Sequence, residues 1–398
     1  MTKKLLFVRL FNVLFLTLFL AGYYISFRQG DTNFAGTRVS LAIGIVLLIL
    51  CHQSIKNALL FFKIDAVVKL FLFLFIGYLA LNTVVFSDWQ SLRRLVSIVL
   101  FCWFLYLCCS NAYFRRDILS WVLWIPLLSI LVSVAFLSSY YMNHGLSVPY
   151  KIAAIFNTEF SYIVNYENSI VAGLFISYLI PFCLYAYFST SSKVKLVVYY
   201  LSVYLALAVL FITFARTAWL ATLIIMLIFF TVSIYRGSFK KVIALYFPLI
   251  LCAIAYLYLY MGADLQRGVT HRDYIWVNVI ENIEGWKEWL IGKGLNERLD
   301  FVKLPYGAIA IHPHNIYIEM LYTTGLIGVS LLCLLLISIL YQGFKVILLE
   351  ENIIWVTLLS GLSVSMFFDF SKLVSSPNIM WLWFWFPIAM LVSTKKLD

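Results

Sequence analysis

The sequence is organised around one stretch, His312-Pro-His-Asn-Ile-Tyr-Ile-Glu-Met-Leu-Tyr-Thr-Thr-Gly-Leu-Ile-Gly328. Proline is tolerated at the first helical position, because its missing N–H has no partner there in any case. We therefore expect a helix from Pro313 to near Gly325, with His314 in its first turn. The helix dipole disfavours a positive charge there, and the exposed N–H groups suit an anion such as phosphate. The stretch predicts either a neutral histidine that accepts a proton or a residue that only caps a helix at an interface.

The composition around this stretch is that of a membrane protein. Of 398 residues, 64% are hydrophobic and only 12% are charged, which excludes a soluble globular protein and indicates an all-α polytopic membrane protein. The net charge of +11 is interpreted as a topological signal, because no basic patch suggests nucleic-acid binding. The seven cysteines lack a CxxC spacing, so neither disulfides nor a metal site is predicted.

Apolar runs long enough to cross a bilayer, roughly 17–22 residues each, recur about twelve times along the chain. We predict three parts: residues 1–261 with transmembrane helices 1–9, residues 262–323 with a periplasmic loop that holds the histidine helix, and residues 324–398 with helices 10–12. The individual runs are expected near 5–26, 39–55, 66–86, 92–112, 118–138, 169–188, 195–214, 217–235, 241–261, 324–343, 353–370 and 378–394.

The distribution of lysine and arginine predicts the orientation of these runs. With the N-terminus inside, the inner loops are rich in basic residues and the short outer loops are poorer, so both termini are expected in the cytoplasm. The long loop 262–312 is then outside. Its residues Tyr274–Ile283 have the pattern of a helix packed on the membrane surface, and a turn is expected at Gly292–Gly294.

Four polar residues from distant parts of the chain are predicted at this outer face. Arg216 interrupts an apolar stretch at an expected tight turn, where it either reaches the lipid headgroups or binds a polar ligand through its forked guanidinium. Arg272 opens the loop helix. His314 begins the helix described above, and Asp369 closes an apolar run, where it needs a partner or is a helix-end charge. No acidic pair suits a divalent ion, so we expect phosphate chemistry that relies on arginine rather than a metal.

With these residues in place, the chain resembles the O-antigen ligase family, within the superfamily of O-antigen ligases and polymerases. The family's R-x3-L motif is matched at Arg216–Leu220, and its motif H-[N/S/Q]-x9-G-x2-[G/T/Y] is matched by His314, Asn315, Gly325 and Gly328. An R-x3-W pattern follows at Arg272–Trp276. Twelve expected helices and one large loop before the histidine extend the resemblance over the whole chain.

The resemblance implies a glycosyltransferase of the bacterial inner membrane that works on the periplasmic side without metal, cofactor or ATP. The donor would be a glycan on undecaprenyl diphosphate and the acceptor a sugar hydroxyl of lipid A-core. Arg216 and Arg272 would bind the diphosphate, and His314 would be the catalytic base. Asn315, Gly325, Gly328 and Asp369 would support them, although Asp369 matches a family acidic position only loosely.

Three alternatives remain open. An O-antigen polymerase would use the same donor with a lipid-linked acceptor. A protein O-oligosaccharyltransferase is expected to carry a further C-terminal periplasmic part. A transporter of lipid-linked sugars would instead need charges along a path through the middle of the membrane.

Overall fold

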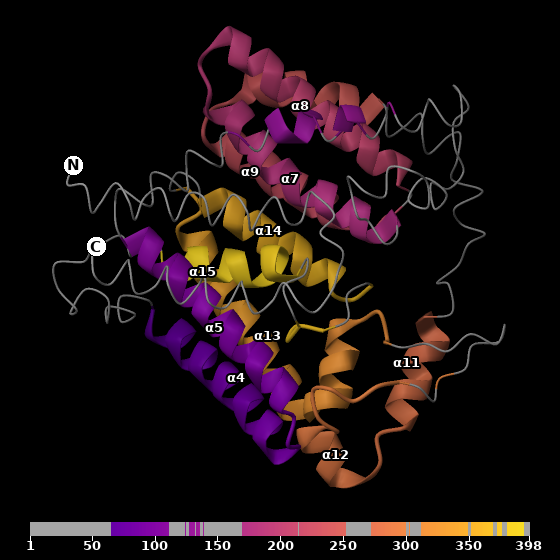
Figure 1. Ribbon diagram of the computed structural model, residues 1–398. Coiled ribbons are helices and arrows are strands. Elements are labelled where there is room, and N and C mark those ends of the chain that lie inside the picture. The colour runs from indigo at the N-terminus through magenta and orange to yellow at the C-terminus, as the bar shows by residue number, and fades with distance from the viewer. Residues whose placement is uncertain are drawn as a thin grey trace.

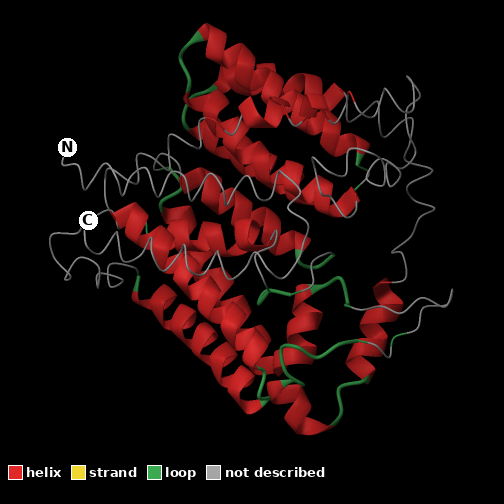
Figure 2. Ribbon diagram, in the orientation of Figure 1, coloured by secondary structure: helices red, strands yellow, loops and turns green. Residues whose placement is uncertain are grey.

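A computed structural model describes the chain at residues 65–110, 124, 127–131, 133–135, 138, 169–213, 215–251, 272–299, 302, 312–348, 352–368, 372–375 and 380–393. Across this part of the chain the regular structure is helical, without strands (Figure 2). The all-α prediction is therefore confirmed for the described residues. The predicted runs 5–26 and 39–55 lie outside them, and the count of twelve spans stays a prediction.

The described helices fall close to the apolar runs expected from the sequence (Figure 1). Their bounds are α4 Ala66–Val85, α5 Trp89–Ser110, α7 Ser169–Ser189, α8 Lys193–Ile212, α9 Arg216–Tyr235, α11 Arg272–Glu281, α12 Gly285–Ile291, α13 Ile316–Lys345, α14 Asn352–Ser365, a π-helix η4 Trp381–Trp385 and α15 Phe386–Val392. Four described helices are long and apolar enough to cross a membrane, namely Ala66–Val85, Lys193–Phe211, Arg216–Tyr235 and Ile316–Lys345. The protein is thus a multi-pass helical bundle.

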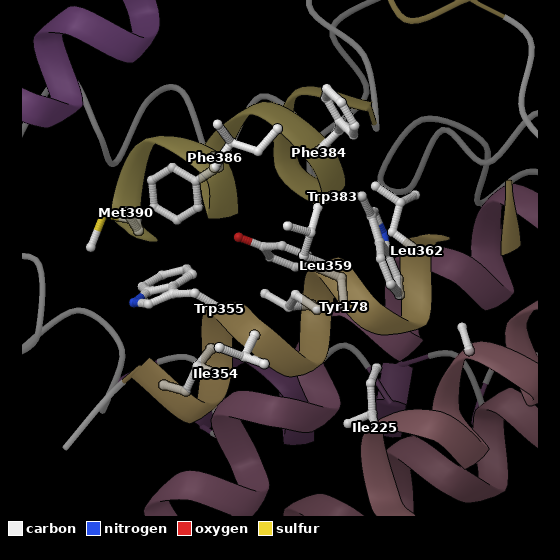
Figure 3. Close-up of a cluster of buried hydrophobic side chains, with 14 of the residues drawn as sticks. Tyr178, Ile225, Ile354, Trp355, Leu359, Leu362, Trp383, Phe384, Phe386 and Met390 are labelled. Atoms are coloured by element: carbon white, nitrogen blue, oxygen red, sulfur yellow. The ribbon is translucent and has the colours of Figure 1, made fainter. Parts of the chain in front are cut away.

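Aromatic side chains fill the centre of the bundle, where α7, α14 and the π-helix meet (Figure 3). Trp355 of α14 is 1% exposed, and its ring lies edge-on to Phe182 and Phe386, at centroid distances of 5.7 and 5.0 Å. Lipid tails are as apolar as these rings, so burial from lipid contributes little, and close packing has to hold the helices together. Large rings in edge-on contact supply that packing.

Small residues and hydroxyl groups hold α7 against α9. A Cβ at Gly173 would lie 2.8 Å from the Ala215 Cβ, so the two backbones approach closely only because this position is glycine. One turn further along α7, the Ser177 hydroxyl donates to the Ala218 carbonyl at 3.1 Å and accepts from Thr222 at 2.8 Å. The beginnings of α7 and α9 are therefore neighbours.

Two hydrogen bonds fix the relative direction of α9 and α13. The guanidinium of Arg236, just after α9, donates to the carbonyls of Ile347 and Leu348, just after α13, at 3.3 and 2.8 Å. Because the two helices end side by side, they run in the same direction and also begin at the same end of the bundle. We call the end at which α13 begins at Ile316 the site end, and the opposite end, with Arg236 and Lys345, the basic end.

Candidate functional site

The histidine helix begins later than its sequence predicted. We expected its first turn at Pro313, but α13 starts at Ile316, and Asn315 is its N-cap. The Asn315 side-chain oxygen accepts from the backbone N–H groups of Tyr317 at 2.9 Å and Ile318 at 3.1 Å, which satisfies two donors that a helix start leaves without partners. The prediction that His314 lies in the first turn is wrong, because the asparagine cap outcompetes proline as the helix start.

His314 lies just before this cap in an unusual backbone conformation. Its φ of 53° is in the left-handed region, which is uncommon for residues with a side chain and costs about 1–3 kcal/mol. Its ring centroid lies 4.2 Å from that of His312, so the two imidazoles lie together ahead of the helix. Strained residues of this kind cluster at functional sites, and the surrounding contacts show what holds this one.

The loop helix α11 holds the histidine loop from one side. The indole N–H of Trp276 donates to the Pro313 carbonyl at 2.9 Å, one residue before His314. Arg272 and Trp276 are four residues apart on α11 and therefore share one helix face. The half-buried Arg272 thus lies on the face of α11 that is turned to the histidine loop, which gives the R-x3-W spacing a physical reason that the sequence alone did not show.

The end of α14 holds the beginning of α13 from the other side. The Ile316 N–H donates to the Met366 carbonyl at 2.9 Å, and the Tyr317 hydroxyl donates to the Ser363 carbonyl at 2.9 Å. The rings of Tyr317 and Phe367 also pack, with centroids 4.3 Å apart. These three contacts close a corner between α13 and α14, and nothing in the sequence pattern predicted them.

Two glycines interlock where α12 meets α13. Gly325, with a φ of 67°, breaks the helical geometry of α13 at the predicted point, although a second helical segment follows it directly. A Cβ on Gly325 would collide with the Leu290 backbone, and a Cβ on Gly292 would collide with the Thr323 backbone. Backbone hydrogen bonds of 2.9 Å from Lys293 to Tyr322 and from Gly294 to Thr323 hold the contact. The predicted turn at Gly292–Gly294 is confirmed, since both glycines have positive φ.

The end of α4 supports this junction from outside. The Tyr78 hydroxyl donates to the Thr324 carbonyl at 2.6 Å, and the Asn82 amide donates to the Ile291 carbonyl at 2.9 Å. A Cβ on Gly328 would collide with the Thr324 side chain, so the second motif glycine leaves room for the turn before it. Tyr78 and Asn82 thus hold the junction in place, and no pattern in the sequence predicted these contacts.

A side-chain ion pair stabilises the turn after α12. Glu288 meets the Lys293 ammonium at 3.1 Å, and its Oε2 accepts from the Glu284 N–H at 2.7 Å. Desolvation alone would raise the pKa of Glu288, but the Glu284 N–H and Lys293 together hold it below its usual range. The pair fixes the geometry of the Gly292 turn that docks on α13.

Arg216 lies at the site end as the first residue of α9. The predicted turn is confirmed: α8 ends at Ile212, and the Thr213 hydroxyl donates to the Leu210 carbonyl at 2.6 Å in place of a glycine or proline. Arg216 is exposed rather than buried. Gly361 of α14 approaches the Ala221 carbonyl, so α14 connects the start of α9 to the corner at Met366.

The structure thus places Arg216, Arg272 and His314 toward one end of the bundle, at the start of α9, at the start of α11 and just before α13. Asp369 lies outside the described residues, as does Arg267. Asn315, Gly325 and Gly328 support the histidine helix in the ways given above. Within the described part of the chain, no cluster of His, Cys, Asp or Glu side chains is placed to hold a metal ion.

These observations define a multi-pass membrane protein with a polar site at one face. The site combines an arginine at a tight turn, an arginine on a loop helix and a strained histidine, all at one end of an apolar bundle. Residues 201–333 match the O-antigen ligase family. The matched region contains all the predicted site residues except Asp369, and over these residues the chain is similar to that family. A search of curated proteins gives no match to the chain.

Proposed function

We propose that the protein is an inverting, metal-independent glycosyltransferase that moves O-antigen polysaccharide from undecaprenyl diphosphate to a sugar hydroxyl of lipid A-core. The proposal is supported by the location of Arg216, Arg272 and His314 toward one end of the bundle, inside the matched family region. The family supports the coarser statement that this is an enzyme acting on lipid-linked polysaccharide. The identities of the donor, undecaprenyl-diphosphate-linked O-antigen, and of the acceptor, lipid A-core, are our proposal.

The proposed reaction is one direct displacement. The acceptor hydroxyl attacks the anomeric carbon of the donor while the bond from that carbon to the diphosphate oxygen breaks. His314 takes the hydroxyl proton as general base. Negative charge grows on the leaving undecaprenyl diphosphate, and the fixed guanidinium groups of Arg216 and Arg272 stabilise it, which is where most of the rate gain arises. A single displacement inverts the anomeric centre.

The two ends of the bundle support a periplasmic location for this site. Several basic residues lie at the basic end, where the Lys241 ammonium donates to the carbonyls of Phe188 and Thr190, at 2.9 and 2.6 Å, close to the end of α7. Lysine and arginine favour the cytoplasmic side of an inner membrane. The opposite, site end then faces the periplasm, where lipid-linked O-antigen and lipid A-core meet.

Complementation of two bacterial strains tests the proposal, one strain lacking its O-antigen ligase and the other its polymerase. We expect a ladder of lipopolysaccharide to return in the ligase-deficient strain and to be lost with His314→Ala or Arg216→Ala. General-base and charge-stabilising residues each contribute about 100-fold or more, so either variant should abolish the ladder at normal membrane levels of the protein. Longer chains restored only in the polymerase-deficient strain would identify a polymerase instead.

Arg216→Lys is the sharper variant of the same test. Lysine keeps the charge but offers a point charge in place of the planar fork that binds two phosphate oxygens together. We expect purified Arg216→Lys to transfer more slowly than wild type and faster than Arg216→Ala. Full activity of Arg216→Ala and His314→Ala together would overturn the proposed chemistry.

A further inference from the structure

One carboxylate in the histidine helix has no role in the chemistry above. Glu319 lies one turn into α13, and only 5% of it is exposed. Its backbone makes ordinary helical contacts, but within the described part of the chain its side chain makes no hydrogen bond and no ion pair. A buried carboxylate is costly unless hydrogen-bond donors or opposite charges compensate it. The carboxylate oxygens of Glu319 can therefore accept hydrogen bonds from a ligand.

Position along the helix places Glu319 beside the catalytic histidine. His314 immediately precedes the N-cap Asn315, and Glu319 is the fourth residue after that cap. The Glu319 N–H donates to the Asn315 carbonyl at 2.9 Å. Glu319 therefore lies one helical turn beyond the cap that directly follows His314.

A cation from a different part of the chain acts on the carboxylate. Burial is the larger effect and disfavours a charge on Glu319, and the electrostatic effect of Lys372 opposes it only in part. The segment that carries Lys372 is fixed in place, because the indole N–H groups of Trp385 and Trp381 donate to the Leu373 and Ser375 carbonyls at 3.1 and 3.2 Å. Lys372 thus acts on Glu319 without an ion pair that would occupy the carboxylate oxygens.

The same corner presents an aromatic surface. Phe367 is 48% exposed and packs on Tyr317, two residues before Glu319. A sugar ring offers hydroxyl donors around its edge and an apolar C–H face. A carboxylate with free acceptor oxygens and an exposed aromatic ring match these two features.

We propose that Glu319 is an acceptor-binding residue, whose carboxylate accepts hydrogen bonds from hydroxyl groups of the acceptor sugar and aligns the reacting hydroxyl with His314. This inference rests on the proposed function, because it assigns a substrate contact within the same site. Lys372 offsets part of the cost of a charge on Glu319, and Phe367 packs against the sugar ring. Hydrogen bonds to a charged group are about twice as strong as neutral ones, so Glu319 contributes to acceptor affinity rather than to the diphosphate chemistry.

Steady-state transfer with purified protein, lipid-linked donor and lipid A-core tests this assignment. We expect the isosteric Glu319→Gln to raise the apparent KM for lipid A-core about 10-fold or more, because the strong charged acceptor is lost. The KM for the donor should stay within about twofold of wild type. Lys372→Met should change the acceptor KM in the same direction by a smaller factor. Glu281→Gln, an exposed carboxylate at the end of α11, is the matched control and should change neither constant.

The outcomes separate the two proposals. If the wild-type protein transfers no glycan to lipid A-core, the proposed function fails, and the assignment of Glu319 fails with it. If wild type transfers and Glu319→Gln leaves the acceptor KM unchanged, only the assignment of Glu319 is wrong. Equal rises in both KM values together with a lower melting temperature would show a purely structural carboxylate and would also overturn it. Should Glu319→Gln not fold, an unchanged acceptor KM in Lys372→Met would count against the assignment, and a raised one would support it.

Discussion

At the scale of single residues, unusual backbone conformations shape the candidate site. His314 and Gly325 both have positive φ, at 53° and 67°, and they bracket the first turns of α13. The conformation of His314 determines how the chain enters α13. The conformation of Gly325 bends α13 before its apolar segment. Glycine reaches this region without penalty, whereas a residue with a Cβ is strained. The two motif positions are therefore under different constraints: chemistry at His314 and space at Gly325.

Gly325→Ala is predicted to destabilise the protein. The added Cβ would meet the Leu290 backbone in a conformation that alanine disfavours, so we expect a loss of about 1–3 kcal/mol and a lower melting temperature in detergent. Gly77→Ala in α4 is the control, because a Cβ at Gly77 would have nothing within 4 Å and alanine favours the helix. A melting temperature for Gly325→Ala equal to that of Gly77→Ala would contradict the interlock.

Asn315→Ala is predicted to weaken the start of α13. It removes the oxygen that accepts from Tyr317 and Ile318, which costs about 1 kcal/mol at an N-cap. Asn315→Ser retains a capping oxygen and should recover most of the loss. Thermal unfolding measures stability, and glycan transfer should fall in parallel in Asn315→Ala, since His314 directly precedes the cap. Equal stability of the alanine and serine variants would exclude a capping role.

At the scale of elements, α11 and α12 contact the loop that carries His314 and the first turns of α13. Their inner faces form a small core in which Ile275, Val279 and Ile283 are buried. Their outer faces carry Val277 at 53% exposure and Trp286 at 77%. Exposed apolar residues on a loop helix, next to a turn that docks on the end of α4, suit the interfacial layer of a bilayer.

A spin label at Val277 is predicted to lie at the membrane surface. In a background without the native cysteines, a nitroxide at Val277 should be more accessible to dissolved oxygen than to a water-soluble nickel reagent, because oxygen partitions into lipid. A label at Glu297, an exposed loop residue, should show the reverse. Equal accessibility of both labels to the nickel reagent would show that α11 lies in water.

At the scale of the whole molecule, the candidate site residues and the basic residues that indicate membrane orientation lie at opposite ends of the bundle. Arg216, Arg272 and His314 lie at the site end, while Arg236 and Lys345 mark the basic end. A transporter would place its notable charges along a path through the middle of the membrane. The described arrangement instead gathers them at one face, which favours catalysis at that face.

Cysteine labelling in whole cells is predicted to separate the two ends. A membrane-impermeant maleimide, applied after the outer membrane is opened, should label Gln90→Cys in the first turn of α5, at the site end. It should label Ser191→Cys, between α7 and α8 at the basic end, only after the inner membrane is broken, because positive charge is retained in the cytoplasm. Both positions are exposed. The opposite labelling pattern would invert the topology and place the site end in the cytoplasm, against the proposed function.

The sequence by itself determined the helical class and the position of most described helices, and it pointed to Arg216, Arg272 and His314 as candidate site residues. Each of these follows from local information: apolar runs of bilayer length, a charge that interrupts such a run, and a motif with fixed spacing. The same local reasoning predicts the start of α13 at Pro313, which is wrong. Proline suits a first helical position, but the capping oxygen of Asn315 decides where the helix begins.

Only the tertiary structure decided how these residues are held. The corner at Met366, the hydrogen bond from Trp276 to Pro313 and the interlock of Gly292 with Gly325 each join residues distant in the chain. Such contacts depend on the packing of helices against one another, and apolar runs of similar composition carry little information about their partners. The burial of Glu319 beside the fixed Lys372 segment belongs to the same class, because a carboxylate in an apolar run shows neither its depth nor its neighbours.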